Sequence, residues 1–225
     1  MNRRTLKIIA LITMTIDHIG MILFPHIDMF RIIGRISFPI FAYFVAEGCR
    51  YTKNRLRYVS LMAMCEAVCL VGYYIGKGYL YFSIMMTFIF SVVIITVYDK
   101  FAEAATHGGK AALVAGIGFM VFLYVMNTLT GILDIMYGFW GCMLPLFVYM
   151  RRDKLSGLVF FTGGLILQSI GSSSVQIYSL MAVPLLLFYD GKKMKTTKFE
   201  KYFYYVYYPL HIGFLYLLNE IIILF

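Results

Sequence analysis

Charged side chains are scarce in this sequence. Lysine, arginine, aspartate and glutamate make up only 14% of its 225 residues, whereas soluble domains contain roughly 25%. Hydrophobic residues account for 61%, the mean hydropathy is +0.81, and no polar stretch is long enough to form a soluble domain. These observations exclude an ordinary water-soluble protein and predict a single integral membrane domain over residues 1–225.

Cysteines at metal-binding spacing are missing as well. The four cysteines lie within or at the ends of apolar runs and form no C-x-x-C pair; they are Cys49, Cys65, Cys69 and Cys142. Cys65 and Cys69 share a helical face, but no histidine stands nearby at ligand spacing. We predict that the cysteines are small packing residues and that the protein has no metal site.

The sequence instead contains a succession of long apolar runs. Hydropathy predicts about nine membrane helices, at residues 6–24, 31–49, 57–76, 80–98, 111–127, 132–150, 155–170, 175–189 and 202–224. The fold class that follows is an all-α, polytopic transmembrane helix bundle. The first run follows a basic Arg3-Arg4 pair, as a signal peptide does, but it carries Asp17 and His18 and lacks a small-residue cleavage site. We therefore expect it to remain as a membrane helix.

Positive charge is distributed asymmetrically along the chain. If the N-terminus is cytoplasmic, the cytoplasmic segments hold every lysine and arginine except Arg31, Arg35 and Lys77. The cytoplasmic set is Arg3, Arg4, Lys7, Arg50, Lys53, Arg55, Arg57, Lys100, Lys110, Arg151, Arg152, Lys154, Lys192, Lys193, Lys195, Lys198 and Lys201. The positive-inside rule then predicts a cytoplasmic N-terminus and a C-terminus outside. Membrane topology thus explains the net charge of +9, and we predict no nucleic-acid partner.

The segment 50–57 has the densest positive charge in the chain. Its four cations are Arg50, Lys53, Arg55 and Arg57. Topology alone accounts for such a loop. Together with Arg3, Arg4 and Lys7 the segment is equally suited to a polyphosphate or to anionic lipid headgroups, so the sequence leaves both interpretations open.

Asp17 and His18 stand side by side in the first apolar run. An ionisable side chain deep in hydrocarbon costs about 2.5–3.5 kcal/mol on insertion scales, so both residues are expected to have partners and a functional role. At a rise of about 1.5 Å per residue they lie roughly 16–18 Å from the inner end of the helix. Adjacent helical positions point about 100° apart, so the two side chains face different neighbours.

Two arginines and a proline mark the second run. Arg31 and Arg35 are four residues apart and therefore share a helical face near its outer end. Arg35 lies a turn deeper and needs an acceptor, for which Asp17 and Asp134 are the candidates. Pro39 is expected to kink the helix and to free a backbone carbonyl near Arg35.

Further polar side chains are expected in the membrane interior. Glu66 lies near the middle of the third run, and His211 lies about 13 Å from the inner end of the last run, a depth similar to that of His18. Tyrosines near helix ends are expected to anchor at the interface. Tyr137, Tyr207 and Tyr208 are exceptions, and we expect them in the interior of the bundle, with Tyr137 and Tyr208 in a functional site.

Several of these residues belong to short motifs. The motifs are Leu6-Lys7-Ile8-Ile9-Ala10, Thr15-Ile16-Asp17-His18-Ile19-Gly20, Arg31-Ile32-Ile33-Gly34-Arg35-Ile36-Ser37-Phe38-Pro39-Ile40-Phe41-Ala42, Ala46-Glu47-Gly48, Tyr51-Thr52-Lys53-Asn54-Arg55 and Tyr208-Pro209-Leu210-His211. With them the chain resembles the TraX family, most specifically from the N-terminus to about Arg57. The family is named for a conjugative-plasmid protein that N-acetylates the mature pilin subunit.

The resemblance implies an acetyl-CoA-dependent membrane acetyltransferase, a multi-pass protein of the bacterial plasma membrane. Such an enzyme takes acetyl-CoA as co-substrate from the cytoplasm and modifies an amine or hydroxyl on the extracytoplasmic side. The expected partners are the lipid bilayer, acetyl-CoA and this acceptor. Whether the acceptor is a glycan, a peptide or a pilin-like protein stays open.

The resemblance also gives the polar residues expected roles, because acetyl transfer needs a base near the acceptor and a donor for the developing oxyanion. We assign His18 as the base, with Asp17 either fixing its tautomer or pairing with Arg35. Arg35 would polarise the carbonyl, and His211 completes the catalytic set. The expected substrate-binding residues are Tyr208, Tyr137, Asp134, Glu66 and Arg31. The residues expected to hold the coenzyme phosphates are Arg50, Lys53, Arg55 and Arg57.

Two other classes of function remain as alternatives. A small proton-coupled transporter also uses mid-membrane Asp, Glu and His side chains as proton relays. Such carriers are expected to show two similar halves with paired broken helices, and no such repeat stands out in this sequence. In a non-enzymatic assembly factor, the same ion pairs would only hold helices together.

Overall fold

The protein is helical throughout the part of the chain that the computed structural model describes, residues 1–151, 153–170, 172–192 and 197–224, and no strand occurs there. Six helical segments are long and apolar enough to cross a membrane: α1 (Arg3–Ile22), the pair α2 (Asp28–Gly34) and α3 (Ser37–Tyr51), α4 (Arg55–Lys77), α5 (Ile84–Ala105), α6 (Gly109–Ile132) and α10 (Lys198–Leu224). Arg152, Lys193 and Lys195, which the charge-based topology uses, lie outside the described residues.

Three shorter apolar segments complete the bundle. They are α7 (Gly138–Tyr149), α8 (Lys154–Ile170) and the 3₁₀-helix η1 (Ser174–Met181), which continues into α9 (Ala182–Leu187). With α2–α3 and η1–α9 each taken as one segment, the described residues form nine successive helical segments. The predicted all-α, polytopic fold class is therefore confirmed.

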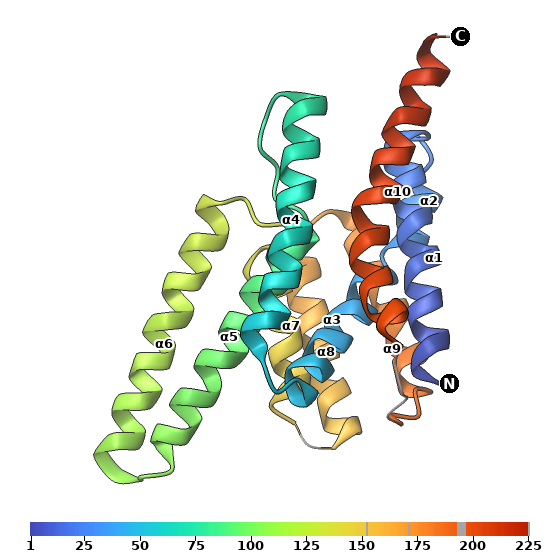
Figure 1. Ribbon diagram of the computed structural model, residues 1–225. Coiled ribbons are helices and arrows are strands. Elements are labelled where there is room, and N and C mark those ends of the chain that lie inside the picture. Colours follow the sequence, from blue (N-terminus) through green and yellow to red (C-terminus); the bar gives the residue numbers. More distant parts are fainter. Residues whose placement is uncertain (152, 171, 193–196, 225) are drawn as a thin grey trace.

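Helix α3 lies in the centre of the bundle and α6 at its edge (Figure 1). In the most hydrophobic 18-residue stretch of α2–α3, 61% of the residues are buried inside the protein. In the corresponding stretch of α6, only 11% are buried. Helix α3 contacts α1, α5, α7, α9 and η1. Helix α6 instead exposes large apolar side chains along its length, among them Leu113, Ile117, Met120 and Val121. An apolar outer face around a more polar interior suits a lipid environment.

Helix boundaries follow local capping groups that hydropathy does not detect. The side chains of Asn2 and Asn54 accept hydrogen bonds from backbone N–H groups in the first turns of α1 and α4. Ser83 caps α5 in the same way, so this helix begins at Ile84 rather than at residue 80. The segment predicted at 132–150 starts only at Gly138, because Asp134 and Tyr137 adopt left-handed backbone conformations with φ of 47° and 65°.

The second crossing segment is broken where Pro39 predicts a kink. Proline has no N–H to donate to the carbonyl four residues earlier, which here belongs to Arg35. The break falls at this residue, between the end of α2 at Gly34 and the start of α3 at Ser37. It places the Arg35 side chain inside the bundle, where only 7% of the residue is exposed.

The close contact between α1 and α2 depends on glycine at position 20. A Cβ atom added there would lie 2.3 Å from the Cβ of Phe30, and overpacking of this kind costs about 1–3 kcal/mol. We expect Gly20→Ala to lower the unfolding temperature of the detergent-purified protein. The matched control is Gly72→Ala in α4, where the added Cβ would meet nothing within 4 Å. Equal unfolding temperatures for the two variants would contradict this account of α1–α2 packing.

Candidate functional site

An ion-pair cluster joins α1 to α2 inside the bundle. The Asp17 carboxylate accepts hydrogen bonds from Arg31 Nη1 at 2.9 Å and from Arg35 Nη2 at 2.9 Å, one on each oxygen. The side chains of Asp17 and Arg35 are only 13% and 8% exposed. Charges so far from water require such partners. Of the two acceptors that the sequence offered for Arg35, the structure uses Asp17.

Two further side chains accept hydrogen bonds from the guanidinium group of Arg35. Its Nη1 donates to Gln176 Oε1 at 3.2 Å and to the Tyr137 hydroxyl at 3.5 Å. The Tyr137 ring stacks on Phe38 with centroids 3.9 Å apart. Burial raises the pKa of Tyr137, so its phenol stays protonated at neutral pH. Arg35 is thus held from α1, from η1 and from the turn before α7.

Two histidines from opposite ends of the sequence meet beside this cluster. His211 Nδ1 lies 2.9 Å from the carbonyl oxygen of Tyr207, and His18 Nδ1 lies 2.8 Å from that of Met14. Carbonyl oxygens only accept hydrogen bonds, so in the neutral rings both Nδ1 atoms carry the proton. His18 Nδ1 also lies 3.2 Å from His211 Nε2, which then accepts.

This arrangement leaves the lone pair on Nε2 of His18 free. Among the described residues no hydrogen bond reaches that nitrogen. The tautomer of His18 is therefore fixed by the Met14 carbonyl and by His211, while Asp17 is occupied by the two arginines. His18 is 9% exposed and lines a cavity.

That cavity has a volume of about 320 Å³, and we call it the histidine cavity. Its polar lining includes Asp17, His18, Arg31, Arg35 and Gln176. Tyrosines make up much of the remaining wall; they are Tyr73, Tyr79, Tyr81, Tyr137, Tyr208 and Tyr216. The cavity lies toward the C-terminal end of α1, and exposed residues such as Tyr79 and Ser172 mark its mouth.

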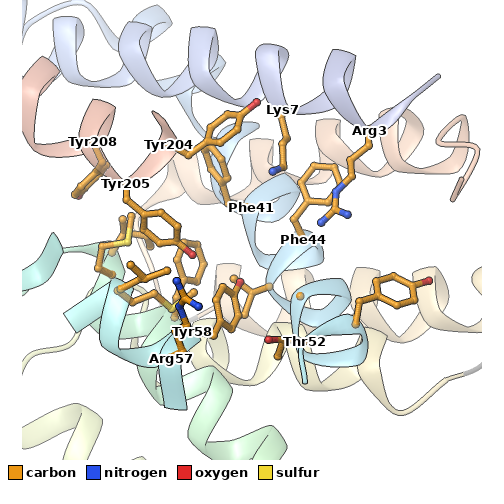
Figure 2. A pocket seen from close by; sticks show the side chains of 18 of the residues that line it. Arg3, Lys7, Phe41, Phe44, Thr52, Arg57, Tyr58, Tyr204, Tyr205 and Tyr208 are labelled. Atoms are coloured by element: carbon orange, nitrogen blue, oxygen red, sulfur yellow. The ribbon is translucent and has the colours of Figure 1, made fainter. Parts of the chain in front are cut away.

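A second cavity of about 600 Å³ lies toward the N-terminal end of α1. We call it the basic cavity because its charged lining residues are all cations, namely Arg3, Lys7, Lys53 and Arg57. Figure 2 shows Arg3 and Lys7 extending from α1 toward Phe44, with Arg57 and Tyr58 on the opposite wall. Lys7 Nζ lies 4.3 Å from the ring centroid of Tyr204, and Arg57 Nη2 donates to the Tyr202 hydroxyl at 3.2 Å.

The two cavities share part of their lining, which we call the partition. Four residues line both of them: Met14, Phe41, Ile84 and Tyr208. The Tyr208 ring makes edge contacts with His18 and His211, at centroid distances of 6.1 and 5.7 Å. The partition therefore lies directly beside the histidine pair.

Two of the predicted substrate-binding residues lie away from this centre. The carboxylate of Glu66 accepts hydrogen bonds from the backbone N–H of Ser83, at 2.9 Å, and from the Ser83 hydroxyl. It thus anchors the start of α5 and lines neither cavity. Asp134 is exposed in the turn before α7 and lines neither cavity. By contrast, Tyr208, Tyr137 and Arg31 all line the histidine cavity.

The four predicted coenzyme-binding cations divide into two pairs. Lys53 and Arg57 line the basic cavity. Arg50 instead caps the carboxyl end of α7 through the carbonyl oxygens of Val148 and Arg151. Arg55 pairs with Asp99 at 2.7 Å and lines neither cavity.

Arg3 and Lys7 take the remaining places in the basic cavity. The sequence predicts that they lie near segment 50–57, but the predicted coenzyme-binding set of Arg50, Lys53, Arg55 and Arg57 does not include them. The signal was available in the sequence, because cations in the first turns of α1 must lie at the same end of the bundle as the turn between α3 and α4.

Fold and site together define a polytopic helical membrane protein with a polar centre reached by two cavities. A family model described as TraX protein matches residues 2–219, so the chain belongs to the TraX family. Its similarity to curated proteins includes the uncharacterized protein RP591 of Rickettsia prowazekii (strain Madrid E), 34% identical over 89 residues. That match covers 34% of this chain and 36% of the other protein, about a third of its length. No solved structure matches.

The ion-pair cluster allows a test that needs no assay of function. Asp17→Asn would leave two arginines without their counter-charge, and breaking a buried pair in this way costs about 3–5 kcal/mol. We expect a large fall in the unfolding temperature of the purified protein. Asp28→Asn, at an exposed position at the start of α2, serves as the control. A fall no larger than that of the control would show that the cluster contributes little to stability.

Proposed function

We propose that this protein is a membrane-embedded acetyltransferase that moves an acetyl group from cytoplasmic acetyl-CoA to an acceptor on the other side of the membrane. One observation carries the proposal. A cation-lined cavity and a histidine-lined cavity extend from opposite ends of the bundle and share a partition beside His18. Such a layout lets two substrates approach one reaction centre from opposite sides of a bilayer. Membership of the TraX family supports the same class of reaction.

The orientation in the membrane is part of the proposal. The ends of the helices around the basic cavity carry most of the lysines and arginines, which the positive-inside rule assigns to the cytoplasm. The N-terminus of α1 is then cytoplasmic and the C-terminal end of α10 is outside, since these two ends lie at opposite ends of the bundle (Figure 1).

The basic cavity suits acetyl-CoA as a co-substrate. Arg3, Lys7, Lys53 and Arg57 supply four positive charges and no carboxylate among the described residues lines the cavity, which favours the coenzyme phosphates. The deeper wall is apolar, with Phe41, Phe44 and Met62, as the narrow pantetheine arm requires. A volume of about 600 Å³ falls within the usual range of ligand pockets, about 300–1,000 Å³.

His18 is the proposed general base. Its Nε2 lone pair takes the proton from the acceptor hydroxyl or amine while the acceptor atom bonds to the thioester carbonyl carbon. The carbon–sulfur bond then breaks, and the imidazolium returns the proton to the coenzyme thiolate. His211 acts as a positioning residue, since its Nε2 accepts a hydrogen bond from Nδ1–H of His18 and holds the ring.

Two groups are placed to stabilise the developing oxyanion. Tyr208 lines both cavities at the partition, where a thioester carbonyl would lie. Arg35 lines the histidine cavity and is a permanent cation. Asp17 then serves the reaction indirectly, by holding Arg35 in place.

A small carrier is the second candidate, because two cavities separated by this partition also suit alternating access. Binding of acetyl-CoA and cleavage of its thioester distinguish the two. A carrier would leave radiolabelled acetyl-CoA intact, whereas the proposed enzyme cleaves it slowly even without acceptor.

Replacement of His18 tests the catalytic centre. General-base catalysis contributes about 10²–10⁴-fold, so we expect His18→Ala to lower thioester cleavage of radiolabelled acetyl-CoA by at least about 100-fold. His107→Ala, in the exposed turn before α6, is the control and should retain full activity. Equal rates in the two variants would remove His18 as the base, and absence of acetyl-CoA binding to the unmodified protein would refute the proposed function itself.

Replacement of Arg57 tests the coenzyme site. A hydrogen bond to a charged group contributes about 1.5–3 kcal/mol, so Arg57→Gln should raise the KM for acetyl-CoA about tenfold or more and change kcat little. The control is Lys110→Gln, which removes a cation at the exposed start of α6. If the KM stays unchanged, Arg57 does not hold the coenzyme phosphates.

A further inference from the structure

The histidine cavity carries a net positive charge. Asp17 is the one carboxylate among the described residues that line it, and both of its oxygens already accept from guanidinium groups. Arg31 and Arg35 supply two positive charges against it. Asp134 lies near Tyr81 but outside the lining and is exposed to solvent. The cavity therefore offers an incoming cation no free counter-charge.

Arg31 has hydrogen-bonding capacity left for a ligand. Only its Nη1 donates to Asp17, and within the described residues Nε and Nη2 have no partner. Its side chain is 29% exposed and lines the cavity. Outside the lining, Lys77 Nζ lies 5.0 Å from the ring centroid of Tyr216, which lines the cavity. Arg31 and Arg35 line this cavity, and Lys77 contacts one of its lining residues, Tyr216.

The opposite wall of the cavity is aromatic and uncharged. Tyr73 lies with its ring centroid 5.2 Å from that of Tyr81 and 6.1 Å from that of Tyr216. Burial raises the pKa of Tyr81 and of Tyr137, so neither phenol supplies a negative charge at neutral pH. Tyrosine combines an apolar ring face with a polar tip. A wall of such rings suits a ligand with C–H faces and several hydroxyl groups.

Resting on the proposed function, we propose that the acceptor bound in the histidine cavity is an acidic carbohydrate, acetylated on a hydroxyl group. Its carboxylate or phosphate pairs with Arg31 and its ring packs on the tyrosines. The hydroxyl proton passes to Nε2 of His18 as the oxygen bonds to the acetyl carbon, and the coenzyme leaves as the thiol after taking that proton back. The product is an O-acetyl ester.

A peptide amino terminus suits this cavity less well. An ammonium group entering it would meet Arg31 and Arg35 at close range, and it would find Asp17 already paired. It would have to lose its proton before binding, at a free-energy cost that a hydroxyl group does not bear.

The experiment measures sugar binding in the absence of coenzyme, so its outcome is separate from that of the acetyl-CoA assays. Saturation-transfer NMR on the purified full chain in nanodiscs would compare methyl glucuronide, methyl glucoside and methyl glucosaminide, which share one ring and differ in charge. We expect the glucuronide to bind at least about tenfold more tightly than the other two. Arg31→Gln should abolish this preference, Arg31→Lys should restore part of it, and Lys110→Gln should leave it unchanged.

Several outcomes would overturn the proposal. Equal binding of the three sugars to the unmodified protein would do so without any variant, and so would tighter binding of the glucosaminide. Absence of saturable binding of all three sugars would also overturn it. If the glucuronide binds but acetyl-CoA does not, the cavity assignment stands and the proposed transferase activity fails.

Discussion

The pairing of Asp17 with Arg31 and Arg35 is the constraint on which the rest of the structure depends. An isolated charge in hydrocarbon costs several kcal/mol, so three of them must be brought together by the fold. This requires α2 to approach α1 closely, and Gly34 permits it, because a Cβ atom there would lie 2.2 Å from Asp17 Oδ1. It also requires the break before α3, which places Arg35 within reach of Asp17.

Much of this fold follows from the sequence because the bilayer imposes simple rules. Long apolar runs must be helices, and cations gather on one side. The i, i+4 spacing of Arg31 and Arg35 indicates that Arg35 needs an acceptor, for which Asp17 was one of two candidates, and Pro39 predicts a kink where the helix breaks. What hydropathy missed are features set by single capping groups, such as Ser83 at the start of α5 and the left-handed Tyr137 before α7.

The sequence predicts which polar residues lie inside the bundle, but not which partner each of them contacts. Position along the helices predicts that His18 and His211 lie at a similar depth. In the structure, Nδ1 of His18 lies 3.2 Å from Nε2 of His211. Depth does not specify which neighbour a polar atom finds. Glu66 bonds to Ser83, and Arg50 and Arg55 bond to the end of α7 and to Asp99, so these groups are used in packing. Which cations face a cavity depends on side-chain direction, which a sequence pattern alone does not give.

The partition of Met14, Phe41, Ile84 and Tyr208 has a consequence for the electric field across the membrane. With water in both cavities, the membrane potential falls mainly across this short apolar layer rather than across the whole bilayer. A unit charge that crosses the layer then experiences most of the potential, about 2.3 kcal/mol per 100 mV. The His18 side chain lies beside this layer, with its ring centroid 6.1 Å from that of Tyr208. His18 lines only the histidine cavity, so a proton that reaches it from that cavity does not cross the layer, whereas a proton from the basic cavity must cross it.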